Sequence, residues 1–513
     1  MPKFLINNTT KAIIIFSIAF VLFYSITYIT INSYEINGQR YFCLFDDAMI
    51  SMRYAENIAN GYGPQWNTTG EKVEGFSNPL WVYIMAIVHL LPISKAYTSL
   101  VIQLIAIILL ILNLILIKKI TENLTKDSKI INLSILLTAV YLPLLNWSLQ
   151  GLEITIIVVL LNLYTLKIIE FLKNNNKSFL IFLLPALLLL IRMDAILFSI
   201  SFILITFFFN KEKLHKLNTP TIFSLLSSLT ILIIWRYAYY HEILPNTYYL
   251  KMTGYPIIHR LIKGLYSFIK FSLFLTPFFL VLPFWHYLKN KNLEILILIT
   301  PLFVMSVYTI YIGGDSWEWW IPSNRFLSAT IPLFIIAALI SINNYFKNYY
   351  YTFSIIFLLT LNFNNWEYLK AELLLEKTFT EKDNRKHTYL ALESKKIITP
   401  QGTAAVTIAG TLPYFLERNC IDILGKNDKA IARMKVLNNN TPLKYNPGHM
   451  KWNYSYSIGK LQPDAVLQLW EKPNEAIPYL QDYEAYNIAG FNVFFLKNSP
   501  NIDWDDLKKS HFP

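Results

Sequence analysis

The sequence predicts a polytopic α-helical membrane protein with about eleven transmembrane helices and a small α/β domain outside the membrane. The 513 residues are 54% apolar and 15% charged, whereas soluble domains contain about 25% charged residues. Apolar runs recur over residues 1–363, most of them near the roughly 20 residues that a crossing helix needs. From residue 364 onward these runs shorten and charged residues spread.

The first apolar run, Ala12–Ile31, follows Lys3 and Lys11 and lacks a small-residue cleavage site. This pattern is typical of a retained anchor rather than a removed signal peptide. Ten later runs are also predicted to cross: 100–117, 130–147, 154–169, 179–191, 195–209, 222–237, 271–288, 295–312, 326–342 and 351–363.

Two stretches need interpretation. Leu80–Ile93 is apolar but short and contains His89, so we expect an interfacial or re-entrant helix that does not cross. Phe179–Phe209 is too long for one crossing and has Arg192 and Asp194 near its middle. We therefore expect two short spans that meet at a polar turn.

The distribution of lysines fixes the predicted orientation. With a cytoplasmic N-terminus, all five inner loops are basic, as the positive-inside rule requires. Their lysines are Lys118, Lys119, Lys126, Lys129, Lys173, Lys177, Lys211, Lys213, Lys216, Lys289, Lys291 and Lys347. Much of the net charge of +12 then reflects membrane topology. Nucleic-acid binding needs a clustered basic face, and the sequence shows none. We expect a bacterial inner (plasma) membrane protein whose C-terminus is extracytoplasmic.

Two domains are predicted. Residues 1–363 form the transmembrane domain, whose first external loop, 32–99, contains interfacial helices. Residues 364–513 form an extracytoplasmic α/β domain, in which Ala404–Ile408, Ala465–Leu469 and Val493–Leu496 have the composition of strands.

Polar residues collect on the predicted outer face, where six separate segments carry carboxylates, guanidinium groups and amides. Ionisable groups at membrane depth are costly, so they usually mark a pathway or a site.

The adjacent pair Asp46 and Asp47 starts a helix-like segment. One Asp can cap that helix, but capping explains two adjacent ones poorly. A carboxylate beside a second one has a raised pKa, which suits a general base for a sugar hydroxyl. Which of the two acts stays open.

Four cations are candidates for binding a phosphate: Arg53, Arg192, Lys251 and Arg325. The planar fork of arginine donates two parallel hydrogen bonds to phosphate. The alternative for each is an interfacial anchor that extends to the headgroups. For Arg192, a structural ion pair with Asp194 is a strong rival.

His449 and Lys451 lie in the predicted outer domain, and His449 has no second histidine at metal-ligand spacing. Cys43 and Cys420 are both external in this topology. They can pair in an oxidising compartment, and unpaired buried thiols are an equal alternative.

A series of short motifs follows one order along the chain. They are Asp46-Asp47, Arg53-Tyr54, Gly61-Tyr62-Gly63, Trp66-Asn67, Glu74-Gly75-Phe76-Ser77-Asn78, Gly151-Leu152-Glu153, Leu244-Pro245-Asn246-Thr247, Gly314-Asp315 with Arg325-Phe326, Asp422-Ile423-Leu424-Gly425 with Asp428, and Gly448-His449 with Lys451. This series resembles the GT-C glycosyltransferases that use polyprenyl-phosphate sugars. Within them it is most similar to the terminal arabinofuranosyltransferase family of cell-wall arabinan synthesis. Met193 and His241 depart from that family's pattern.

The resemblance implies an inverting transfer on the outer face of the membrane, from a polyprenyl-phosphate donor to a glycan or lipid acceptor hydroxyl. Asp46 or Asp47 would be the general base, and arginines would stabilise the leaving phosphate. We assign substrate binding to the polar residues of these segments: Glu74, Asn78, Glu153, Asp194, Asn246, Tyr248, Asp315, His449 and Lys451. No cofactor is certain. A divalent cation held by Asp46, Asp47 and Asp315 stays open.

Two other function classes were weighed. A flippase or transporter of a lipid-linked sugar needs polar or broken helices near mid-membrane and often shows a repeat between two halves. Here the polar motifs concentrate at one face and no internal repeat is evident. A receptor or assembly factor leaves the Asp pair in the long first loop unexplained.

Overall fold

A computed structural model describes residues 3–175, 178–209, 211–317, 324–362, 368–436 and 441–510. The chain forms two compact units, each assembled from several stretches. The first unit comprises Met1–Ile31, Gln103–Leu232 and Ile258–Glu376. The second comprises Asn32–Ile102, Ile233–Ile257 and Lys377–Pro513. The predicted domain boundary between residues 363 and 364 lies outside the described residues.

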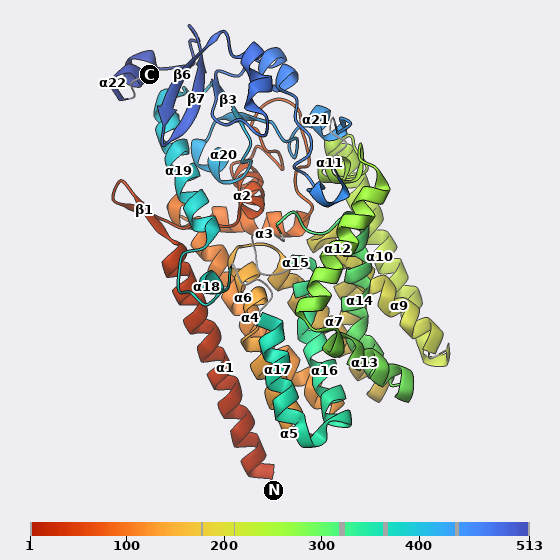
Figure 1. Cartoon of the computed structure of the whole chain (residues 1–513). Coiled ribbons are helices and arrows are strands. Elements are labelled where there is room, and N and C mark those ends of the chain that lie inside the picture. The colour runs from red at the N-terminus through yellow and green to blue at the C-terminus, as the bar shows by residue number, and fades with distance from the viewer. Residues whose placement is uncertain are drawn as a thin grey trace. The chain divides into compact units, whose positions relative to one another are not determined.

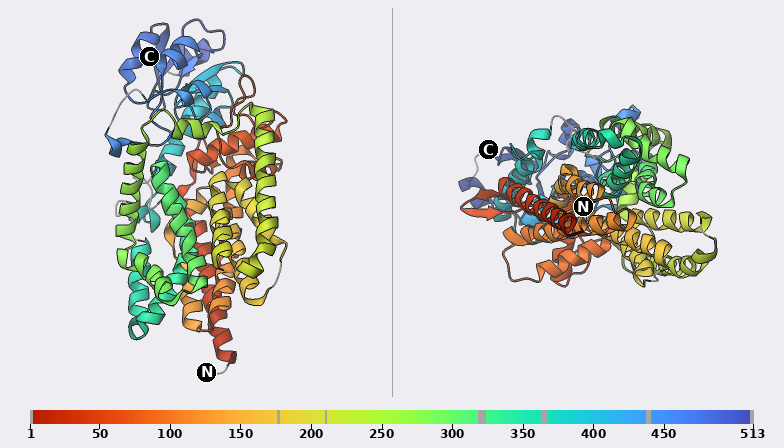
Figure 2. Two further views of the ribbon diagram at one scale, coloured as in Figure 1. Left: turned by 90° about the vertical axis from the view of Figure 1, so that its right-hand side faces the viewer. Right: turned by 90° about the horizontal axis from the view of Figure 1, so that it is seen from below.

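The first unit is a helical bundle whose long helices run side by side (Figures 1 and 2). Helices α4 and α10 contribute residues to both units. The helices of the bundle are α1 (Lys3–Asn32), α4 (Lys95–Leu124), α5 (Ser128–Ala139), α6 (Leu142–Leu149), α7 (Ile154–Asn174), α8 (Leu180–Ile191), α9 (Ile196–Phe209), α10 (Lys211–Tyr240), α12 (Ile257–Phe274), α13 (Pro277–Asn290), α14 (Leu293–Ile312), α15 (Arg325–Ser328), α16 (Ile331–Tyr345), α17 (Tyr350–Asn362) and α18 (Leu369–Glu372).

Within the described ranges, five helices are long and apolar enough to cross a membrane, or up to seven spans if each of two bent pairs counts as one. The five lie within α1, α4, α7, α10 and α14, and the bent pairs are α5 with α6 and α12 with α13. The protein is thus a polytopic helical membrane protein. The number of eleven crossings and their orientation stay predictions.

Prolines break two of the predicted spans. The predicted span 271–288 is not one straight helix, because α12 and α13 are bent by 91° where Thr276 has a φ of 66° and Pro277 starts the second helix. Proline lacks the N–H that a continuing helix would use. A 44° bend likewise separates α5 from α6, which has Pro143 in its first turn. The expected polar turn inside 179–209 is present as a 3-10 turn, Met193–Ala195, between α8 and α9.

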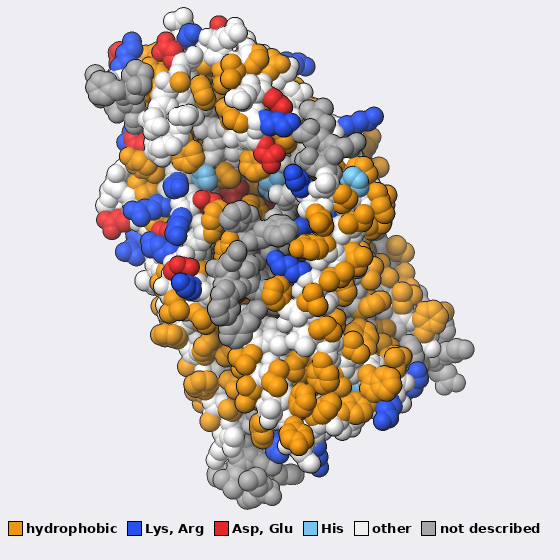
Figure 3. Space-filling view, viewed as in Figure 1, with side chains coloured by type: hydrophobic (Ala, Val, Ile, Leu, Met, Phe, Trp, Pro, Cys, Tyr) orange, Lys and Arg blue, Asp and Glu red, His pale blue; other side chains and the backbone are white. Residues whose placement is uncertain are grey.

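Helix α12 has its polar face inside the bundle. Arg260 and Lys263 are buried, whereas apolar side chains of the same helix, such as Ile258 and Leu273, are exposed. Figure 3 shows apolar side chains spread over this part of the first unit. An exposed apolar surface of this kind matches a lipid environment.

The second unit joins residues 32–102 to the C-terminal segment around one small sheet (Figure 1). Its elements are β1 (Tyr34–Ile36), β2 (Gln39–Tyr41), α2 (Asp46–Ala59), α3 (Pro79–His89), α11 (Asn246–Met252), α19 (Phe379–Ile397), β3 (Thr403–Val406), α20 (Thr411–Leu416), β4 (Asn419–Asp422), α21 (Lys429–Arg433), β5 (Ala465–Val466), β6 (Tyr483–Ile488), β7 (Phe491–Leu496) and α22 (Trp504–Ser510).

The sheet has the order β4-β3-β5-β7-β6. Strands β4, β3 and β5 are parallel, while β7 is antiparallel to both β5 and β6. All three predicted strands are present, as β3, β5 and β7, and β4 and β6 add two that the prediction lacked. Ala489 and Gly490 join β6 to β7 with φ values of 58° and 79°, which suit a two-residue hairpin turn. Ala405, Ile423 and Val466 form the buried centre.

Asp464 ties the start of β3 to the start of β5. One carboxylate oxygen accepts from the Thr403 amide at 2.7 Å and the other from the Ser499 hydroxyl at 2.6 Å. Burial alone would raise the pKa of Asp464, but these bonds and one from Asn501 outweigh it and lower the pKa below 3.8. The ionised carboxylate therefore stabilises the sheet at neutral pH.

We expect Asp464→Asn to destabilise the protein by about 1–3 kcal/mol at pH 7, because an amide nitrogen replaces one acceptor oxygen. Since the folded-state pKa is lowered, the difference from wild type should shrink as the pH falls below 3.8. Thermal unfolding in detergent across this pH range measures it. An unchanged melting temperature at pH 7 would contradict the structural role.

Candidate active site

The Asp pair lies in the first turn of α2, with its carboxylates directed at the C-terminal segment of the second unit. The N-cap of α2 is Phe45, so neither Asp46 nor Asp47 is the capping residue. One oxygen of Asp46 accepts from the backbone amides of Gly410 at 3.2 Å and Thr411 at 2.8 Å. Asp47 forms an ion pair with Lys426. The capping explanation for the pair is therefore wrong.

Glycine is required where Asp46 meets the sheet. A Cβ on Gly410 would lie 2.1 Å from the backbone oxygen of Asp46. The pKa of Asp46 is raised to about 6, chiefly by its removal from water and also by the neighbouring Asp47. Lys426 and the amides of Thr411 and Gly410 oppose it. A carboxyl group with a pKa near neutral is suited to proton transfer.

Lys426 is presented by a rigid loop that follows β4. Asp422, the last residue of β4, accepts from the amides of Leu424 and Gly425 with one oxygen and from Asn427 with the other. Gly425 has a φ of 79°, which glycine adopts without strain. The ends of β3 and β4 thus deliver the partners of Asp46 and Asp47 to one edge of the sheet, where α/β folds commonly place their sites.

His449 and Lys251 complete this group of charges. The pKa of His449 is lowered to about 3, chiefly by burial and also by the ammonium groups of Lys426 and Lys251, while Asp47 opposes them. His449 is therefore neutral at pH 7. A Cβ on Gly448 would lie 3.3 Å from Cε of Lys251, which places that side chain against the His449 loop. We call Asp46, Asp47, Lys251, Lys426 and His449 the acid–base cluster.

Asn246 and Lys451 are predicted substrate-binding residues that hold the loops of the cluster. The Asn246 amide donates to the carbonyls of Gly425, Lys426 and Asp428 at 2.9–3.2 Å. The Lys451 ammonium donates to the carbonyls of Ala432 and Tyr249 at 2.5 and 3.1 Å. Both side chains are buried. These contacts favour a positioning role, and substrate binding by either residue stays a prediction.

The five N–H groups of Arg53, a predicted phosphate ligand, are all directed at the protein. The guanidinium donates to the carbonyls of Trp66, Pro413 and Arg418, to the Asn67 side chain and to the Cys420 sulfur. It also stacks on the Trp66 ring, 4.6 Å from the centroid. This geometry favours a structural arginine that anchors α2 to the C-terminal segment.

Glu74, another predicted substrate-binding residue, forms a two-bond ion pair with Arg236. The two side chains are 2% and 0% exposed, so the pair is sealed from solvent. Asn78 precedes α3 and accepts from the Ser51 hydroxyl at 3.2 Å. Tyr248 is 38% exposed and packs edge-on against Tyr249.

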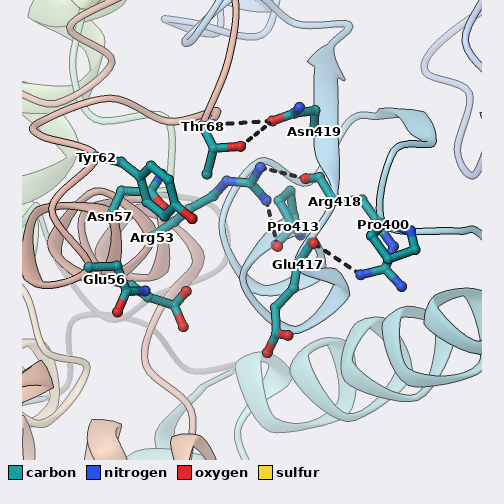
Figure 4. Close-up of a pocket in the computed structure, with 11 residues that line it drawn as sticks. Arg53, Glu56, Asn57, Tyr62, Thr68, Pro400, Pro413, Glu417, Arg418 and Asn419 are labelled. Atoms are coloured by element: carbon teal, nitrogen blue, oxygen red, sulfur yellow. Dashed lines mark hydrogen bonds between the residues drawn. The ribbon is translucent and has the colours of Figure 1, made fainter.

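A separate pocket of about 210 Å³ lies beside α2 (Figure 4). Its lining includes Arg53, Glu56, Tyr62, Glu417 and Arg418, and contains no member of the acid–base cluster. Figure 4 shows the Arg53 guanidinium directed at the carbonyls of Pro413 and Arg418 rather than into the open space. The carboxylates of Asp46 and Asp47 therefore lie outside this pocket.

The remaining predicted site residues belong to the first unit. Arg192 donates to Glu153 at 2.7 Å and to both oxygens of Asp194 at 2.8 and 3.0 Å, so the structural pairing anticipated for it exists. Its guanidinium lies 4.5 Å from the centroid of Phe326.

A second pair joins Arg325 to Asp315, with 3.1 Å between Nε and Oδ2. Both side chains are buried, and the Arg325 guanidinium lies 5.9 Å from the Trp147 ring centroid. Phosphate binding by Arg192 and Arg325 stays a prediction.

The cysteines are free, and a metal cluster is not evident in the described ranges. Cys43 contacts the Thr411 hydroxyl at 3.6 Å, whereas Cys420 lies beside Arg53. No group of three His, Cys, Asp or Glu side chains suited to a metal ion occurs among the residues that the structure describes. Asp315, one of the three proposed ligands, belongs to the first unit and Asp46 and Asp47 to the second.

Two important residues, Lys426 and Arg236, were absent from the sequence prediction. Lys426 lies inside the Asp422 to Asp428 motif, and that motif is the sequence feature that could have identified it. Arg236 lies near the end of a predicted transmembrane run, where a charged side chain is costly unless it is paired. Nothing in the sequence identifies Glu74 as that partner.

We expect Glu74→Gln and Arg236→Met each to destabilise the protein by about 3–5 kcal/mol, since either leaves a buried charge unpaired. The control is Glu242→Gln, which breaks the more exposed pair with Arg433 and should cost about 0–1 kcal/mol. Tryptophan fluorescence during thermal unfolding measures both. Wild-type stability with lost activity in Glu74→Gln would instead support substrate binding.

Asp46→Asn is expected to stabilise the protein above pH 6, by about 1–3 kcal/mol. The folded-state pKa of about 6 lies above the ordinary value of 3.8, so ionisation of Asp46 costs stability as the pH rises through this interval. The asparagine oxygen can still accept from Gly410 and Thr411. Melting temperatures between pH 4 and 8 test this, with exposed Asp505→Asn as control. A less stable variant at pH 7.5 would show that the carboxylate is structural.

No family model matches the chain, and no curated protein matches it in sequence. Solved structures do match in fold. ArnT from Cupriavidus metallidurans bound to undecaprenyl phosphate aligns with a TM-score of 0.58 at 9% identity, covering 93% of this chain and 97% of that one. The Archaeoglobus fulgidus oligosaccharyltransferase in complex with Zn and sulfate aligns with a TM-score of 0.54 at 11% identity, covering 95% and 73%.

The oligosaccharyltransferase AglB from Archaeoglobus fulgidus, in complex with an inhibitory peptide and a dolichol-phosphate, aligns with a TM-score of 0.50 at 11% identity, over 96% and 74% of the two chains. At these identities the likeness establishes the fold alone. The predicted fold class, a GT-C-like helical membrane protein with a small C-terminal sheet domain, is confirmed.

Proposed function

We propose that this protein is a glycosyltransferase that moves a sugar from a polyprenyl-phosphate donor to an acceptor hydroxyl on the outer face of the membrane. The observation that carries the proposal is the acid–base cluster, in which two carboxylates, two ammonium groups and a neutral imidazole converge. Its support is the fold shared with proteins whose structures contain undecaprenyl phosphate or dolichol-phosphate.

Asp47 is the proposed general base. Asp46 is occupied by the amides of Gly410 and Thr411, whereas Asp47 lies beside Lys426 and His449. Asp47 takes the proton of the acceptor hydroxyl, the acceptor oxygen bonds to the anomeric carbon, and the bond from that carbon to the phosphate oxygen breaks. Attack opposite to the leaving phosphate inverts the anomeric configuration.

The donor phosphate is proposed to contact Lys251. A cationic group beside the leaving oxygen stabilises the charge that develops on it. The proposed acceptor is a glycan or a lipid, and an arabinofuranosyl donor is the finer proposal that the sequence motifs suggest. We also propose a bacterial inner membrane location with a cytoplasmic N-terminus, from the distribution of lysines.

The test is release of polyprenyl phosphate by the purified chain in nanodiscs, supplied with polyprenyl-phosphate sugars and a panel of glycan and lipid acceptors. We expect release with one donor, and losses of about 10²–10⁴-fold in Asp47→Asn, as for removal of a general base. Asp505 and Asp506 form a matched Asp pair in the first turn of α22, and their Asn variants should keep full activity.

Full activity in both Asp46→Asn and Asp47→Asn would show that the catalytic assignment is wrong. Movement of a lipid-linked sugar between leaflets, without release from any donor, would favour the flippase alternative.

A further inference from the structure

The ion pair between Lys426 and Asp47 is a contact that the proposed reaction has to change. A base that bonds to an ammonium group is a weaker base, because the opposite charge favours its ionised form. The two side chains are 11% and 17% exposed, so water screens the pair only in part. In the structure as it stands, Asp47 is paired with Lys426.

The backbone of Lys426 is fixed while its side chain is long and flexible. Its carbonyl accepts from Asn246 at 3.0 Å, and the neighbouring Asn427 is fastened to Asp422 and to the Tyr54 hydroxyl. A four-carbon stem lets the ammonium group change partner without any movement of the loop.

Two ammonium groups lie near this part of the second unit. Lys426 is paired with Asp47, and Cε of Lys251 lies 3.3 Å from the place of a Cβ on Gly448, the residue before His449. Both ammonium groups oppose protonation of His449 and so lower its pKa. An anion that enters beside His449 and Lys251 therefore comes within reach of Lys426 and competes with Asp47 for it. A phosphate group suits this place, because lysine binds phosphate as a point charge.

We propose that Lys426 is exchanged between Asp47 and the donor phosphate, so that binding of a polyprenyl phosphate releases Asp47 to act as the base. The inference rests on the function proposed above. In the reaction Asp47 gains the acceptor proton, and the departing phosphate keeps the electron pair of the broken carbon–oxygen bond. Lys426 then neutralises that phosphate, and it returns to Asp47 once the product leaves and Asp47 gives its proton to water.

The test measures binding of farnesyl phosphate to the full chain in nanodiscs by isothermal titration calorimetry, without any acceptor or turnover. Because Asp47 competes with the ligand for Lys426, Asp47→Asn should lower the Kd about 3–10-fold. Lys426→Met should raise the Kd about tenfold or more, and Lys426→Arg should restore most of the affinity. The double variant should bind like Lys426→Met alone, since no exchange remains.

Lys395 and Glu417 form an exposed ion pair elsewhere in the second unit. Substitutions in this pair remove the same kinds of charge and serve as matched controls. Lys395→Met and Glu417→Gln should leave the Kd unchanged. A tighter Asp47→Asn variant cannot result from misfolding. If Asp47→Asn binds no more tightly than wild type, or if the two effects simply add, the exchange is wrong while the proposed donor class stands.

Binding of farnesol and of inorganic phosphate, measured in the same way, distinguishes a lipid-linked phosphate from a free phosphate as the ligand. Weak binding of both, relative to farnesyl phosphate, is the expected result. Inorganic phosphate that binds as tightly as farnesyl phosphate would overturn the lipid-linked ligand. No binding of farnesyl phosphate by the wild type would overturn the proposed donor class itself.

Discussion

The removal of two adjacent carboxylates from water is the constraint on which the candidate site depends. Asp46 and Asp47 each require a donor from another part of the chain, because an uncompensated buried charge is costly. The ends of β3 and β4 supply these donors through Gly410, Thr411 and Lys426. The small sheet, the loop after β4 and the first turn of α2 therefore form one electrostatic arrangement.

Two kinds of charged group coexist in the second unit. Arg53 has its hydrogen-bonding capacity directed at the protein, and the pair of Glu74 with Arg236 is sealed from solvent. The acid–base cluster is different, because the side chains of Asp47 and Lys426 are 17% and 11% exposed, and Asp46, Lys251 and His449 are half-buried. Chemistry that needs a proton or a phosphate to enter is compatible with the second kind and not with the first.

In the first unit, buried charged side chains also face partners, here within an apolar helical bundle. Helix α12 turns Arg260 and Lys263 inward, and Arg192 is enclosed by Glu153 and Asp194. The free-energy cost of a charged side chain in a membrane protein is reduced where it faces partners inside the bundle. The polar turn between α8 and α9 exists because Arg192 and Asp194 satisfy each other at that point.

The sequence by itself determined the helical membrane architecture, the strands β3, β5 and β7 and the helix that starts at Asp46, because apolar length and local composition are encoded in contiguous residues. It did not determine the bends at Thr276 and Pro143 or the strand β4. Tertiary structure decided that Glu74 pairs with Arg236, 162 positions away, and that Lys426 reaches Asp47 across 379 positions. Such pairings depend on how distant segments fold together, so no local pattern specifies them.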